Sequence, residues 1–163
     1  MKKIITAAVS ILLTFTLSAQ EGRSIYNKYS DAENVSAVYI SPAMFRIMGK
    51  LPEMNLSGND VPFSSIVKSL NGFYLIESKN SSINASLKAD AEKMIRSGRY
   101  ELLMEARDNG QTVHIYISGD EQTVVGLVMF VDEKDSVAFI NIDGNMSRAK
   151  LEKLIADSAS DTQ

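Results

Sequence analysis

Residues 99–142 read RYELLMEARDNGQTVHIYISGDEQTVVGLVMFVDEKDSVAFINI, and they carry the strongest structural signal in the chain. Apolar and polar residues alternate through much of this segment, which is typical of strands with one buried face. The sequence Asp-Asn-Gly at residues 108–110 interrupts the alternation, and Asn-Gly favours the positive φ angles of a two-residue hairpin turn. Polar turns at residues 119–121 and 132–135 follow. The segment therefore predicts four hairpin-linked strands, a C-terminal antiparallel meander.

The alternation within the meander also predicts which face of the sheet is covered. Tyr100, Leu102 and Met104 alternate with Glu101 and Glu105. In the next strand, Val113, Ile115 and Ile117 alternate with His114 and Tyr116. We expect helices to pack on one face of the sheet, and the other face, with Glu101, Glu105, His114 and Tyr116, to be partly solvated. Residues 124–131 are apolar at both alternating sets of positions, which predicts a central strand covered on both faces.

Strand and helix patterns precede the meander, and one helix follows it. Ser41 and Pro42 suit the N-cap and first position of a helix. The complete prediction is strand 35–40, helix from 42, short helix from 62, strand 73–76, helix 82–97, four strands and helix 147–156. This order predicts an α+β fold with a largely antiparallel sheet and helices packed on one face.

The N-terminal segment Met1–Ala19 has the parts of a signal peptide. Lys2 and Lys3 precede a mostly apolar run, and small residues then lead into a polar sequence. The run is shorter than the roughly 20 apolar residues of a transmembrane helix. We therefore expect a signal peptide at 1–19, one α+β domain at 20–157 and a polar tail at 158–163. The chain has no cysteine for a lipid anchor, so we expect an exported protein, periplasmic or secreted, without a stable membrane anchor.

Composition narrows the classes of function. With no cysteine, the chain has no disulfides, thiolate catalysis or thiolate metal ligands. Removal of Lys2 and Lys3 from 17 basic residues leaves 15 against 20 acidic residues, a formal charge of −5. This balance argues against nucleic-acid binding, which requires a basic surface, and disfavours anionic membranes.

No catalytic, cofactor-binding or metal-binding set of residues emerges from the sequence. His114 is the only histidine, and no pattern ties a serine and an acid to it as a triad requires. Glu101 and Glu105 lie roughly 13 Å apart on a regular strand, too far for a paired-carboxylate site. We therefore expect no enzyme activity, no cofactor and no metal.

Two short motifs resemble acceptor sites for bacterial protein O-glycosylation, which use an exposed hydroxyl beside an acid. They are Asp135-Ser136-Val137 and Asp157-Ser158-Ala159. Ser158 fits this role better than Ser136, because it lies in the polar tail.

The mature chain resembles an uncharacterised Bacteroidota envelope family, catalogued as domain of unknown function 4252. The residues that carry the resemblance are Val35–Ser41 leading into Met44-Phe45, Tyr100–Met104, and Ile140–Gly144 before Leu151–Leu154. The resemblance implies a small exported or lipid-anchored protein without an assigned activity, often encoded beside extracytoplasmic-function sigma factors. This chain departs from the anchored members by lacking the lipid-bearing cysteine, and the family offers no functional residues to transfer.

We therefore expect a non-catalytic module that binds a partner or is associated with envelope-stress signalling. Its partner is an unknown envelope protein or a small ligand. The candidate surface is Glu101, His114 and Tyr116, or the loop Leu51–Val61. Two alternatives stay open: a hydrolase that uses hydroxyl and carboxylate groups, and a structural protein of the envelope or cell surface.

Overall fold

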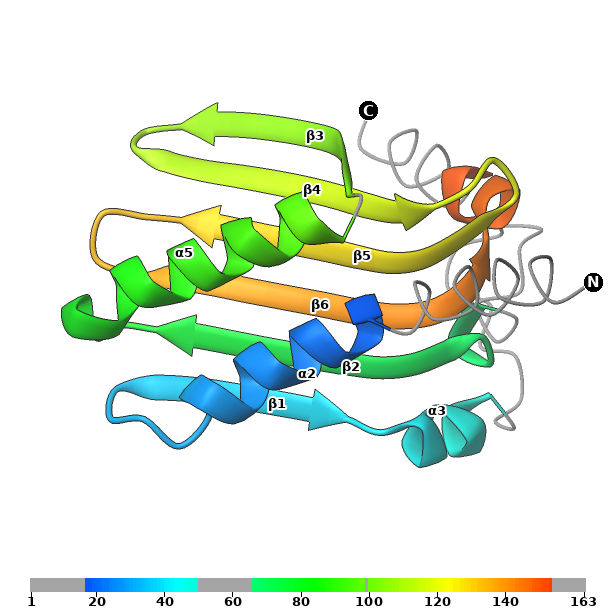
Figure 1. Cartoon of the computed structure of the whole chain (residues 1–163), viewed down its shortest axis with the longest axis horizontal. Helices are drawn as coiled ribbons and strands as arrows, with labels where there is room; N and C mark the ends of the chain where they lie inside the picture. Colours follow the sequence, from blue (N-terminus) through cyan, green and yellow to red (C-terminus); the bar gives the residue numbers. More distant parts are fainter. Residues whose placement is uncertain (1–16, 50–65, 99, 154–163) are drawn as a thin grey trace, which may run out of the picture.

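The computed structural model describes residues 17–49, 66–98 and 100–153 (Figure 1). Residues 1–16 of the expected signal peptide, the loop Leu51–Val61 and the tail 158–163 lie outside this part. The elements are α2 (Leu17–Tyr29), β1 (Val35–Ile40), α3 (Pro42–Met48), β2 (Leu70–Ser78), α5 (Ser81–Ser97), β3 (Glu101–Asp108), β4 (Gln111–Gly119), β5 (Thr123–Asp132) and β6 (Val137–Ser147). Residues 148–153 are helical, as expected for the start of the last helix.

Six strands form one antiparallel sheet in the order β1-β2-β6-β5-β4-β3. The expected C-terminal meander is confirmed, since β3 to β6 are consecutive neighbours. The Asn-Gly turn is confirmed as well, with φ of 45° at Asn109 and 87° at Gly110. Pairing of β6 with β2 joins the meander to the N-terminal half of the chain, so that both halves share one sheet.

Polar caps define the helices that leave the strands. The Ser41 hydroxyl accepts a hydrogen bond from the Met44 amide at 3.3 Å, and Pro42 is the first helical residue of α3. Helix α5 begins one residue earlier than expected, because the Asn80 side chain accepts from the Ser82 amide at 3.0 Å. These caps satisfy amides that have no partner within the helix.

Helices α2 and α5 lie side by side over one face of the sheet (Figure 1). The Tyr29 hydroxyl donates to Asp90 at 2.7 Å, and the Lys28 ammonium group lies 2.6 Å from the same carboxylate. Burial alone would raise the pKa of Asp90, but these two hydrogen bonds outweigh it and lower the pKa. The core beneath comprises Ile25, Tyr29, Ile76, Leu87, Ala91, Met94, Val128, Phe130, Val137 and Phe139.

Gly22 allows α2 to approach the sheet closely. A Cβ atom on Gly22 would lie 1.7 Å from Oδ1 of Asn141, a fully buried residue of β6. A larger residue would therefore force the helix or the Asn141 side chain to move.

The expected assignment of the two faces is wrong for β4. The register pairs His114 with Phe130, and Phe130 with Phe139 beneath the helices. His114, Tyr116 and Glu105 therefore share the helix-covered face, whereas Ile115 points to the opposite face. The alternation within β4 led to the opposite assignment. It separates the side chains into two sets, but it does not show which set contacts the helices.

Candidate binding surfaces

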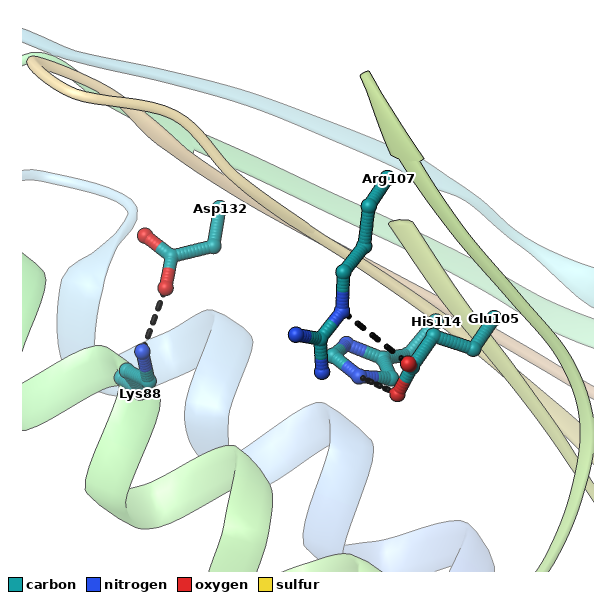
Figure 2. Close-up of polar contacts among 5 residues, drawn as sticks. All are labelled: Lys88, Glu105, Arg107, His114 and Asp132. Atoms are coloured by element: carbon teal, nitrogen blue, oxygen red, sulfur yellow. Dashed lines mark hydrogen bonds and ion pairs between the residues drawn. The ribbon is translucent and has the colours of Figure 1, made fainter. Parts of the chain in front are cut away.

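A charged cluster lies at the edge of the helix-covered face, on strands β3 and β4 (Figure 2). It continues the row of side chains that contains Phe130 and Phe139. Nε2 of His114 lies 2.9 Å from Oε2 of Glu105, and Nε of Arg107 donates to Oε1 of Glu105 at 3.0 Å. The hydrogen bonds from His114 and then Arg107 lower the pKa of Glu105. The carboxylate thus orients both a ring and a guanidinium group.

Tyr116 extends this cluster toward the core. Its ring is stacked on His114, with centroids 5.9 Å apart. Burial, with Glu105 and Glu92 nearby, raises the pKa of Tyr116. Figure 2 also shows Lys88 of α5 paired with Asp132 of β5, so an ion pair links the helix layer to the sheet beside the cluster.

The cluster is polar and partly open to solvent. The His114 side chain is 24% exposed, so a partner can reach its edge. Within the described residues, no serine or threonine hydroxyl is hydrogen-bonded to its imidazole. Those residues also contain no group of three or more histidine, aspartate or glutamate side chains arranged to hold a metal ion.

The structure separates Glu101 from the other residues of the expected surface. An irregularity in β3 between Leu102 and Met104 shifts the register, so that Glu101 pairs with Ile117 on the face opposite His114. Arg148 lies 3.0 Å from Glu101 and donates through Nε to the Asp120 carbonyl. A regular alternation would have placed Glu101 and Glu105 on one face, and the sequence shows no signal for the irregularity.

A buried polar group lies beneath the N-terminal half of α2 and was not identified from the sequence. Asp143 is 4% exposed, and burial raises its pKa to about 7 against the effect of Asn141. The Tyr100 hydroxyl is buried without a hydrogen-bond partner, and burial raises its pKa. Gly126 gives the Tyr100 ring space, because a Cβ there would lie 2.8 Å from the hydroxyl. The group is enclosed, so it bears on stability more directly than on binding.

The face opposite α2 and α5 carries a continuous apolar row. Its middle row crosses all six strands without a polar residue: Val38, Leu75, Ile140, Met129, Ile115 and Met104. Val38 and Met104, at the two edges, are each 45% exposed, and the four residues between them are partly exposed. Sequence reasoning missed this row because its members belong to strands distant in the chain.

Two flanking rows complete this surface, which we call the open face. One consists of Ile40, Phe73, Ile142, Leu127, Ile117 and Glu101, and the other of Ser36, Glu77, Ala138, Val131, Val113 and Ala106. Leu151 of the helical residues 148–153, with Ile66 and Leu70, packs at one corner near Ile117 and Leu127. Among the described residues, no helix covers the middle row.

Of the remaining predicted positions, Ser136 lies in the described part of the chain, and it belongs to neither surface. The Ser136 hydroxyl donates to Glu133 at 2.9 Å in the turn between β5 and β6. Ser158 and the loop Leu51–Val61 lie outside the described residues. None of the helices in the described ranges is long and apolar enough to cross a membrane.

Comparison with known proteins gives one result. Neither a curated protein nor a solved structure matches the chain. A family model described as "Domain of unknown function (DUF4252)" matches residues 29–154, from the end of α2 through the last described helix. This range covers most of the chain and the whole sheet, so the chain belongs to the DUF4252 family.

Proposed function

We propose that this protein is an exported, non-catalytic binding module that works in the periplasm or outside the cell. Its binding surface in this proposal is the open face. The observation that supports it is the middle row, in which Val38, Ile140 and Met104 belong to one apolar band across six strands. Contiguous exposed apolar surfaces of several hundred Å² mark interaction sites in soluble proteins.

The packing of the described helices on the sheet does not account for this band. The helices bury the other face, where Ile76, Leu87 and Phe139 are fully enclosed. An antiparallel sheet that is covered on one side ordinarily presents polar residues on the other. An apolar band retained there favours a role in association, which also fits the expected envelope setting of this family.

Dye binding tests the role of the open face. Anilinonaphthalene sulfonate, which fluoresces on exposed apolar surface, is titrated into the folded chain without its leader over a dilution series. At dilutions where both proteins are monomeric, we expect saturable binding by the original chain that Met129→Lys weakens strongly, because Met129 lies in the middle row. The matched control is Met44→Lys on α3, where the methionine is exposed outside the open face.

The proposal fails if the folded chain binds no dye at a dilution where sedimentation shows a monomer, or if Met129→Lys binds as much dye as the original chain at that dilution. Both variants must retain the native circular dichroism spectrum for these dye results to be interpreted.

The contact between His114 and Glu105 supports one alternative, a hydrolase in which the carboxylate orients the imidazole. A panel of activated esters tests it directly. Turnover that His114→Ala abolishes, while Arg107→Ala retains it, would establish this alternative over the binding module.

A further inference from the structure

We infer that the occupant of the open face is a second copy of this chain, so that two sheets pack face to face in a homodimer. This inference rests on the proposed function, since it names the partner of the same surface. Sheets in sandwich proteins pack about 10 Å apart through interdigitated apolar side chains. The middle row, from Val38 to Met104, presents such side chains without interruption.

The size of the surface matches a stable dimer. Six strands about 4.8 Å apart and three rows about 7 Å apart give a footprint of roughly 600 Å². The corner near Ile117 is already covered by Leu151. About 500 Å² of flat area then remains on each copy, and upright side chains expose more than the flat area, so two copies bury more than about 1,000 Å² together.

The charge distribution of the open face suits contact with itself. A two-fold interface places the same patch on both copies, so any central charge would approach an equal charge. The acidic residues of the face, Glu77 and Glu101, lie in the flanking rows and are paired with Lys79 and Arg148. The centre therefore brings no like charges together, although the mature chain carries a formal charge of −5.

A lipid surface is a poorer match to the same face. Peripheral binding to membranes combines an apolar surface with basic residues that reach anionic headgroups. The three rows of the open face contain no lysine or arginine. The composition of the open face thus favours another apolar protein surface as its binding partner.

Sedimentation equilibrium of the chain without its leader tests the inference. We expect a mass twice that of the chain, and Met129→Lys is expected to give a monomer because it places a charge near the centre of the interface. Met44→Lys should remain dimeric. Met129→Gln serves as a second variant if Met129→Lys does not fold, and it is expected to raise the dissociation constant at least tenfold.

Three results would overturn the inference. A dimer unaffected by both substitutions at Met129 would assign the interface to another surface. A monomer that binds dye through Met129 would keep the proposed function and replace the second copy by another partner; sedimentation of that monomer with neutral phosphatidylcholine vesicles would identify the partner as lipid. A monomer that binds no dye would reject the inference and the proposed function together.

Discussion

The two faces of the sheet both carry apolar residues across several strands, but the described helices cover only one of them. The helix-covered face includes His114, Asn141 and Asp143, yet most of it is enclosed. The open face has an apolar middle row across all six strands, yet no described helix lies over that row. Apolar content therefore does not identify the core here. The core is defined by where α2 and α5 pack, and the apolar surface opposite them is the one that we propose for association.

The largest expected effect compares two phenylalanines on the two faces. Phe139 is fully buried beneath the helices, whereas Phe73 is partly exposed on the open face. We expect Phe139→Ala to cost about 3–5 kcal/mol of unfolding free energy through cavity formation. Phe73→Ala should cost less than half as much in the monomer. Urea unfolding at concentrations where the chain is monomeric measures both, and equal losses would remove the distinction between the faces.

The buried carboxyl group of Asp143 should make the covered face sensitive to pH. Burial raises the folded-state pKa to about 7, above the ordinary value of 3.8. The folded state then holds a proton that the unfolded state has released, so stability falls as pH rises from about 4 to 7. We expect Asp143→Asn to be more stable than the original chain at pH 8 by roughly 2–4 kcal/mol.

Chemical denaturation at pH 5 and pH 8 checks this expectation. Asp135→Asn, in the exposed turn after β5, is the control and should leave the pH dependence unchanged. An Asp143→Asn variant that loses stability between pH 5 and pH 8 as the original chain does would contradict the assignment to Asp143.

Substitution of Gly22, where α2 closely approaches the sheet, should change stability by a smaller amount. The expected change is opposite in sign to the usual effect of replacing glycine by alanine in a helix. Alanine ordinarily stabilises a helix relative to glycine by roughly 1 kcal/mol. At Gly22 the added Cβ would overlap Asn141, so Gly22→Ala should instead destabilise by about 1–3 kcal/mol. Ser24→Ala on the exposed side of α2 is the control, expected to be neutral or slightly stabilising. Thermal unfolding measures both, and a higher melting temperature for Gly22→Ala would show that α2 is not closely seated.

The smallest expected effect concerns the cluster at the margin of the covered face. His114→Ala removes the main hydrogen bond to Glu105, so the pKa of Glu105 should rise toward its ordinary value. Arg107→Ala should raise it less. Carbon-13 NMR titration of the Glu105 carboxyl group follows this change, and an unaltered titration in His114→Ala would mean that the contact is absent in solution.

Much of the fold follows from local sequence patterns. The Asn109-Gly110 turn, the Ser41 cap and the strand at Val35–Ile40 were predicted where they occur, because each depends on residues close together in the chain. The ends of β2 and β6 extend beyond the prediction, since pairing between these distant strands lengthens both.

The binding surfaces were less accessible to prediction. Assigning His114 to a face requires knowing that it pairs with Phe130 in β5. Strand β5 is apolar on both faces, so its sequence does not show which face the helices cover. The separation of Glu101 from Glu105 depends on an irregularity in β3 that leaves no mark in the sequence. The open face becomes visible only once six strands are placed in register.

Thiol labelling at two adjacent positions tests the difference between the faces most directly. The chain has no cysteine, so Met129→Cys and Val128→Cys each introduce a single probe on opposite faces of β5. We expect the thiol at position 129 to react rapidly in dilute solution and to become protected as concentration rises, while the thiol at position 128 stays protected throughout. Equal reactivity of the two thiols, or protection of position 129 at every dilution, would contradict an accessible apolar face that associates with a second copy.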